Sequence, residues 1–135
     1  MGDQRLRILI CEDDDRLAAL VTETLDADGR FEVIARAMNG DQAIRLAEEH
    51  EPDVVLMDIG MPGLDGIDAT REIRQRDAKQ HVVIYTGSDV YEDVGRADAV
   101  GAAGFLHKEA LTSPDLPDAI QVLHTNFVSG RTEPD

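Results

Sequence analysis

Acidic residues stand at the ends of two apolar runs in this sequence. Glu12 and Asp13 directly follow the mostly apolar run from Leu6 to Cys11, and Asp58 closes the run that starts at Val54. Apolar runs too short to form a helix are typical of buried parallel strands. The carboxyl ends of parallel strands lie along one edge of a sheet. We therefore expect the three carboxylates to converge at that edge.

Two further polar residues are predicted at the same edge. Thr86 follows the apolar run that starts at His81, and Lys108 follows a short run that starts at Ala103. Clustered carboxylates repel one another and favour a hard divalent cation, and Mg²⁺ suits oxygen ligands. An aspartate beside a metal ion and an ammonium group can act as a nucleophile toward a phosphoryl group. Asp58 is therefore a candidate phosphoryl acceptor, and the Thr86 hydroxyl can donate a hydrogen bond to the phosphoryl group.

Each of these residues has an ordinary structural explanation when it is taken alone. An aspartate at a strand end is commonly a turn former, a threonine there is unremarkable, and a lysine is most often a surface charge. Asp65 is interpreted in this way, as the N-cap of the following helix. The functional interpretation rests on the coincidence of the acids, the threonine and the lysine at successive strand ends.

The elements that must position these residues alternate along the chain. Strands are predicted over 6–11, 31–37, 54–58, 81–85 and 103–106. Apolar residues at helical spacing predict helices that cover 17–25, 64–73 and 90–100, and a last helix that starts near Pro114 and Pro117 and continues to Phe127. A further helix is predicted to open at Asn39 and Gly40, and Pro52 prevents it from running into the strand that ends at Asp58. This alternation predicts an α/β fold, (βα)₅, in which a five-stranded parallel sheet is doubly wound with right-handed crossovers. We expect one domain over residues 1–128 and a frayed polar tail or linker start over 129–135.

Two of these elements are expected to differ from the others. The strand over 31–37 has imperfect alternation, which favours a position near the edge of the sheet. The helix over 90–100 carries Gly95 in its middle, and a glycine there costs roughly 1 kcal/mol relative to alanine. This helix is therefore predicted to be the softest element.

Composition excludes several classes of partner. The chain of 135 residues carries 13 Lys and Arg against 28 Asp and Glu, for a formal net charge of −15. Such a surface repels nucleic acid and anionic membranes, so we expect no DNA binding by this domain itself. No apolar run reaches the roughly 18 residues that span a bilayer, and no signal peptide opens the chain. The single cysteine, Cys11, cannot form an internal disulfide, which fits a cytoplasmic protein. The histidines at 50, 81, 107 and 124 show no spacing typical of metal ligands.

At this point the sequence resembles the receiver domains of two-component response regulators, the CheY-like superfamily. The motifs that carry the resemblance are ILICEDD at 8–14, MDIGMPGLDG at 57–66, YTG at 85–87 and GAAGFLHK at 101–108. Each motif is weak alone, but together they occur in the family's order and spacing from Leu6 to about Phe127. The resemblance implies the flavodoxin-like strand order 2-1-3-4-5.

The resemblance also implies a role for each site residue. Asp58 would accept a phosphoryl group from a sensor histidine kinase, and Thr86 and Lys108 would bind the phosphoryl oxygens. Asp13, the Asp58 carboxylate and the backbone carbonyl of Gly60 would hold Mg²⁺ directly, with Glu12 acting through water. Phe105 falls at the family's aromatic switch position, where it would respond to Thr86.

The implied protein is a phosphoacceptor signalling domain and not an enzyme, since it promotes only its own phosphorylation and dephosphorylation. Its further partner would be a downstream protein or a fused output domain. Whether phosphorylation also drives formation of a homodimer is left open.

The sequence departs from the family pattern after the conserved lysine. Most members have proline there, usually after a cis peptide bond, whereas Glu109 follows Lys108 here. A cis bond before a residue other than proline costs about 3 kcal/mol, so we expect a trans bond and a different loop. A lysine followed by an acid resembles receivers that carry helix-turn-helix output domains for transcription regulation, yet no such domain is present in this sequence. A stand-alone receiver and the excised N-terminal part of a longer regulator both remain open.

Three alternative functions were weighed against this interpretation. An aspartate phosphatase of the haloacid-dehalogenase type would carry a second acid two residues after its nucleophile, where this chain has Gly60. A flavodoxin-like cofactor binder needs a phosphate loop after its first strand, where this chain has four acids. A degenerate receiver that only binds a partner protein would lack a phosphorylation-site residue, and none is missing.

Overall fold

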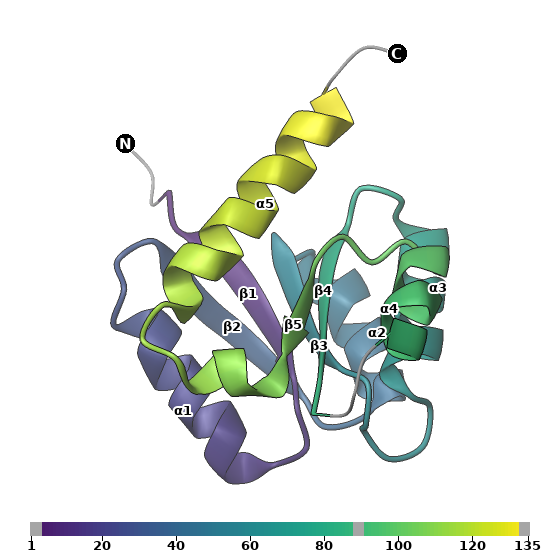
Figure 1. Cartoon of the computed structure of the whole chain (residues 1–135), viewed down its shortest axis with the longest axis horizontal. Coiled ribbons are helices and arrows are strands. Elements are labelled where there is room, and N and C mark those ends of the chain that lie inside the picture. The colour runs from purple at the N-terminus through teal and green to yellow at the C-terminus, as the bar shows by residue number, and fades with distance from the viewer. Residues whose placement is uncertain (1–3, 88–90, 133–135) are drawn as a thin grey trace.

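A parallel sheet of five strands forms the middle layer of the molecule (Figure 1). The structure is a computed structural model, which describes residues 4–87 and 91–132. The strand order is β2-β1-β3-β4-β5, as expected, and β2 lies at the edge of the sheet. The strands are β1 (Leu6–Cys11), β2 (Phe31–Ala37), β3 (Val54–Asp58), β4 (His81–Thr86) and β5 (Phe105–His107).

The helices begin where short polar side chains cap their first turns. The side chains of Asp14, Asn39 and Asp65 accept hydrogen bonds from the first backbone N–H groups of α1, α2 and α3 respectively, so the predicted cap at Asp65 is confirmed. The helices are α1 (Asp15–Asp26), α2 (Gly40–His50), α3 (Gly66–Arg76), α4 (Tyr91–Ala99) and α5 (Leu116–Thr132), with a short 3₁₀ helix, η1 (Lys108–Thr112), before α5. Within the described part of the chain, no helix is both long and apolar enough to cross a bilayer.

Two hydrophobic cores fill the spaces between the sheet and its helices. Alternate strand residues such as Ile10, Leu56 and Val83 pack against α1 and α5 on one face. Their neighbours, such as Cys11, Met57 and Ile84, pack against α2 and α3 on the other face. Because both faces of the central strands are covered, these strands are mostly apolar.

Several boundaries differ from the sequence prediction. The third helix was expected over 64–73, but α3 spans Gly66–Arg76, because Asp65 caps its first turn. The fifth strand was expected over 103–106, but β5 starts at Phe105, because Gly104 takes a φ of 139° in the region that favours glycine. The fourth helix was expected over 90–100, and α4 spans Tyr91–Ala99, while Val90 lies outside the described residues. The helix α5 continues to Thr132, so residues 129–132 of the expected polar tail are helical, and 133–135 lie outside the described residues.

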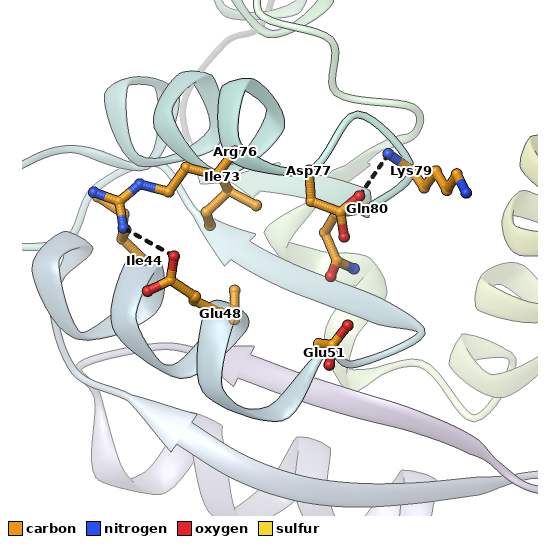
Figure 2. A pocket seen from close by; sticks show the side chains of 9 residues that line it. Ile44, Glu48, Glu51, Ile73, Arg76, Asp77, Lys79 and Gln80 are labelled. Carbon is orange, nitrogen blue, oxygen red and sulfur yellow. Dashed lines mark hydrogen bonds and ion pairs between the residues drawn. The ribbon is translucent and has the colours of Figure 1, made fainter.

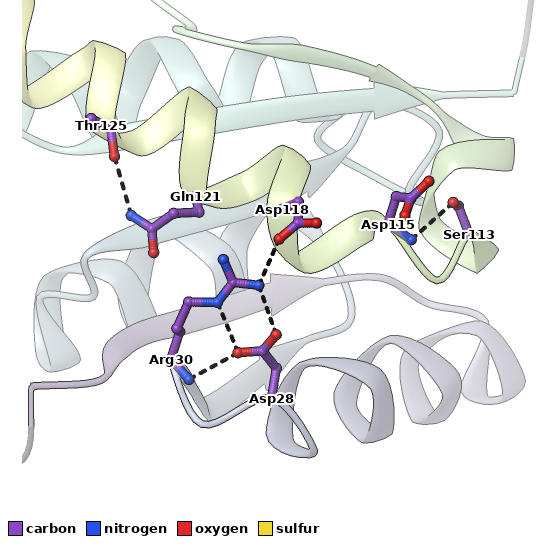
Figure 3. Close-up of polar contacts among 7 residues, drawn as sticks. All are labelled: Asp28, Arg30, Ser113, Asp115, Asp118, Gln121 and Thr125. Atoms are coloured by element: carbon purple, nitrogen blue, oxygen red, sulfur yellow. Dashed lines mark hydrogen bonds and ion pairs between the residues drawn. The ribbon is translucent and has the colours of Figure 1, made fainter.

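A polar contact ties the turn after α1 to the start of α5 (Figure 3). Arg30 Nη2 lies 2.7 Å from Asp28 Oδ2 and 2.9 Å from Asp118 Oδ1. The hydrogen bonds from Arg30 lower the pKa of Asp28 to about 2. Arg30 and Asp118 are exposed and Asp28 is half-buried, so the contact is expected to contribute little to stability.

A histidine pair, in which His81 is buried and His124 is half-buried, joins the amino end of β4 to α5. His81 Nε2 donates to the carbonyl oxygen of Ala103 at 2.6 Å, and its Nδ1 lies 3.0 Å from His124 Nδ1. The Phe127 ring stacks on His81 with centroids 4.3 Å apart. Burial lowers the pKa of His81 to about 4. The spacing of these histidines in the sequence did not predict the pair.

Candidate functional site

Three carboxylates meet at the carboxyl edge of the sheet, as the strand ends predicted. One ligand oxygen from each of Glu12, Asp13 and Asp58 lies within 4.8 Å of the other two. Glu12 is 1% exposed and Asp58 4% exposed, whereas Asp13 is exposed. The cluster therefore has a buried base and one side open to solvent.

The backbone after β3 folds back onto the strand end and orients Asp58. Gly60 N donates to Asp58 Oδ1 at 3.0 Å, and Gly66 N donates to the Ile59 carbonyl at 3.1 Å. A β-carbon on Gly66 would overlap the backbone carbonyl of Asp58, so this position accepts glycine alone. The backbone of the loop after β3 thus fixes the orientation of the Asp58 carboxylate.

Both oxygens of the Glu12 carboxylate accept hydrogen bonds. The Tyr85 hydroxyl donates to Oε1 at 2.7 Å, and the backbone N–H of Asp14 donates to Oε2 at 2.9 Å. Burial raises the pKa of Glu12, and these two hydrogen bonds oppose that rise because they favour the ionised form. The negative charge of Asp58 is a smaller cause of the same rise, in line with the expected crowding of like charges.

Thr86 and Lys108 lie at the ends of the two strands on the other side of Asp58. Thr86 is the last residue of β4 and is 5% exposed. Lys108 opens η1 directly after β5, with its stem beside Gly87. Its charge is close enough to oppose the rise in the pKa of Glu12. The structure therefore places the five predicted residues at one sheet edge.

The two residues assigned to the switch share one face of the sheet. Phe105 pairs with Ile84 in the parallel register, and Thr86 follows Ile84 by two positions on β4. Phe105 is partly buried and packs against the core on the side of α2 and α3. No cis peptide bond occurs in the described chain, so the predicted trans bond between Lys108 and Glu109 is confirmed.

The donor set fits a hard cation. Glu12, Asp13 and Asp58 offer oxygen atoms only, and no other group of three or more potential ligand side chains gathers within the described residues. Cations such as Mg²⁺ bind through few carboxylates and keep several waters, which the exposed side at Asp13 allows. Gly60 is exposed beside Asp58, where the resemblance places a backbone ligand.

Tyr85 is a site residue that was not predicted from the sequence. An aromatic residue in an apolar run indicates a core position, and the 1% exposure of Tyr85 agrees with that. The available signal was its position directly before Thr86, where a phenol hydroxyl reaches the carboxyl edge.

A pocket of about 450 Å³ lies away from this site, between α2 and α3 (Figure 2). Its apolar floor includes Ile44 and Ile73, and the Gln80 amide points into it in Figure 2. Gln80 Nε2 donates to the carbonyls of Pro52 and His81, and Arg76 pairs with Glu48 at 3.5 Å. These polar groups bind one another, so the pocket shows no convergent chemistry like that of the acidic cluster.

Comparison with known proteins agrees with the geometry. The family model of the response regulator receiver domain matches residues 8–121. The chemotaxis protein CheY of Halobacterium salinarum is 36% identical over 114 residues, which cover 84% of this chain and 92% of that protein. The signal receiver domain of the putative response regulator NarL from Mycobacterium tuberculosis superposes with a TM-score of 0.84 at 28% identity, covering 90% of this chain and 98% of that one.

A longer relative covers the same region. The transcriptional regulatory protein DegU of Brevibacillus brevis is 32% identical over 123 residues, which are 91% of this chain but 52% of that protein. The chain thus spans nearly all of one relative and about half of another.

Proposed function

We infer the function of this chain from the fact that it belongs to the response regulator receiver domain family. We propose that Asp58 accepts a phosphoryl group from a sensor histidine kinase in a Mg²⁺-dependent reaction. Phosphorylation then changes a surface that binds another protein. The observation that carries the proposal is the cluster of Glu12, Asp13 and Asp58, whose ligand oxygens lie within 4.8 Å of one another at the strand ends.

The residues present would hold the cation in a defined way. Asp13 and Asp58 would bind it directly with the carbonyl of Gly60, and Glu12 would act through water. Bound Mg²⁺ would neutralise the carboxylates and the oxygens of the transferring phosphoryl group. The need for a cation follows from the mutual repulsion of the acids, two of which are buried.

The chemical step is a transfer between two covalent partners. A carboxylate oxygen of Asp58 attacks phosphorus, and the bond from phosphorus to the donor nitrogen of the kinase histidine breaks as the new O–P bond forms. The Lys108 ammonium would pair with a phosphoryl oxygen, and the Thr86 hydroxyl would donate a hydrogen bond to another. Positioning and charge neutralisation are the protein's contributions.

The signal would leave the site through Thr86 and Phe105. An inward movement of Thr86 toward the phosphoryl group would vacate space on the face that it shares with Phe105. Phe105 has no hydroxyl, so packing alone sets its position. The neighbouring helix α4 contains Gly95, so we expect its displacement to cost little free energy. The surface of α4, β5 and α5 would change, as a population shift between two packings.

The surroundings of the domain are also proposals. A sensor histidine kinase and a downstream protein or fused output domain are its expected partners, in the cytoplasm. The net charge of −15 disfavours direct contact with nucleic acid. Since the chain spans about half of DegU, an output domain like that of a transcription regulator would have to lie on additional chain.

Phosphorylation by a small-molecule phosphodonor tests the assignment by intact mass. We expect one phosphoryl group on the wild-type protein with Mg²⁺, and none with EDTA or in Asp58→Asn. The matched control is Asp53→Asn, because Asp53 precedes the same strand at its opposite end and accepts from Arg7 N at 2.8 Å. Full labelling of Asp58→Asn, or labelling that survives EDTA, would refute the proposal.

A further inference from the structure

We propose that Tyr85 is a positioning residue of the metal site, whose hydroxyl holds the Glu12 carboxylate in the orientation that accepts from a water of the bound cation. This inference rests on the proposed function and assigns a role to a residue outside the family motif's acids, threonine and lysine. Its basis is the hydrogen bond of 2.7 Å between the Tyr85 hydroxyl and Glu12 Oε1.

The register of the sheet brings these residues into one row. Asp58 on β3 pairs with Tyr85 on β4, and Ile10 on β1 pairs with Leu56 on β3. Glu12 follows Ile10 by two positions, as Asp58 follows Leu56. Because side chains alternate between faces, Glu12, Asp58 and Tyr85 all lie on the side of α1 and α5.

The phenol ring bridges two strands that are not neighbours. The order of the sheet puts β3 between β1 and β4, so the Tyr85 side chain extends past the end of β3 to reach Glu12. Its hydroxyl also lies 3.2 Å from the carbonyl oxygen of Cys11. An aliphatic residue at position 85 could fill the core but could not reach the carboxylate, and phenylalanine would lack the donor.

The consequence is a carboxylate that is fixed before a cation arrives. Glu12 is 1% exposed, and its two oxygens are held separately by Tyr85 and by the backbone of Asp14. A buried carboxylate that lost one of these donors would keep an unpaired oxygen and could turn away from Asp13 and Asp58. Hydrogen bonds behind metal ligands set ligand orientation in this way, and their removal typically weakens metal binding by 10- to 100-fold.

Calorimetric titration of Mg²⁺ into Tyr85→Phe tests the proposal, since this change keeps the ring and removes one oxygen. We expect about tenfold weaker binding than in the wild type. Thr22→Val is the matched control, because it also deletes a hydroxyl hydrogen bond, to Ala18 O at 2.7 Å, but on α1 away from the acids. That control should bind Mg²⁺ like the wild type.

A double-mutant cycle separates positioning from general stability. In a Glu12→Gln background the charged partner is gone, so adding Tyr85→Phe should cause little further loss of affinity. Equal affinity of Tyr85→Phe and the wild type, or fully additive losses in the double variant, would overturn the inference while wild-type Mg²⁺ binding upholds the proposed metal site. A wild type that binds no Mg²⁺ would overturn both.

A second variant covers the case in which Tyr85→Phe fails to fold. Glu12→Asp keeps the charge but shortens the side chain by one methylene, which withdraws the carboxylate from the Tyr85 hydroxyl. It should weaken Mg²⁺ binding by a similar factor while leaving Tyr85 and the core unchanged. Undiminished binding in Glu12→Asp would count against the role of Tyr85.

Discussion

The two edges of the sheet differ in how their polar side chains are partnered. At the amino edge, the Gln80 amide donates to two carbonyls, and both nitrogens of His81 are engaged. At the carboxyl edge, Glu12, Asp13 and Asp58 bring three negative charges within 4.8 Å. The polar groups at the amino edge have hydrogen-bond partners within the protein. The carboxylates at the carboxyl edge instead lie close to groups of the same charge.

This difference separates a structural site from a functional one. A polar group that finds its partner inside the protein contributes to the fold and needs no ligand. Crowded carboxylates lower stability until a cation neutralises them, so their persistence at a strand edge indicates a use outside folding. The strand β4 takes part in both, with His81 at one end and Tyr85 and Thr86 at the other.

The largest expected effect is the loss of stability at the amino edge when the pH is lowered. The pKa of His81 is lowered from 6.5 to about 4 in the folded protein, so the unfolded chain takes up this proton more readily. The His81 contribution to stability is therefore complete above pH 6.5 and is lost as the pH falls toward 4. At pH 4.5 the loss is about 2.5 kcal/mol. Urea unfolding at pH 7.5 and 4.5 should show the stability gap between wild type and His81→Gln narrowing by that amount.

Other groups face His81 and must be accounted for in this measurement. His124 on α5 and Arg74 on α3 add positive charge that helps to lower its pKa. The control is His50→Gln, which removes a histidine outside this cluster. A gap that narrows equally in His50→Gln would show that burial of His81 does not set the acid sensitivity.

The next effect concerns the carboxyl edge and its cation. Mg²⁺ at ten times its dissociation constant should stabilise the folded protein by about 1.4 kcal/mol through mass action. In EDTA, Asp58→Asn should instead be more stable than the wild type by about 1 kcal/mol, since one of the repelling charges is gone. Thermal melts of both proteins in Mg²⁺ and in EDTA provide the measurement.

Replacement of a buried polar side chain should change the melting temperature with opposite signs at the two edges, a fall for Gln80→Ala and a rise for Asp58→Asn in EDTA. Gln80→Ala removes a paired buried group at the amino edge and should lower the melting temperature with or without Mg²⁺. Asp13→Asn should weaken the Mg²⁺-dependent rise. Identical melting midpoints in Mg²⁺ and EDTA for the wild type would show that the acids are not a metal site.

The smallest expected effect concerns how far a change at the carboxyl edge reaches into α4 and β5. A β-carbon on Gly95 would meet no atom within 4 Å, so Gly95→Ala should stabilise α4 by up to about 1 kcal/mol. Amide hydrogen exchange with beryllofluoride and Mg²⁺ should show protection changes over residues 91–106 in the wild type and smaller ones in Gly95→Ala.

Thr86→Ala supplies the matched test of the route. It should leave Asp58 able to accept a phosphoryl group while reducing the exchange response over 91–106. Changes confined to the loop after Asp58 in the wild type would contradict transmission through Thr86 and Phe105.

Local patterns in the sequence determined most of the fold and most of the acidic site. Mostly apolar runs located the strands, and the acids at the ends of two of them marked the carboxyl edge. The cap at Asp65 was predictable because capping is a contact between residues three apart or fewer. These features record the burial and hydrogen bonding of a segment with its own neighbours in the chain.

Only the tertiary structure decided which distant side chains touch. Tyr85 and Glu12 lie 73 residues apart, and His81 and His124 lie 43 apart, yet each pair is within hydrogen-bonding distance. In sequence, Tyr85 looked like an ordinary core aromatic and the histidines looked unrelated. Their contacts depend on strand order, on register and on the docking of α5 against β4, none of which leaves a periodic signal in the chain.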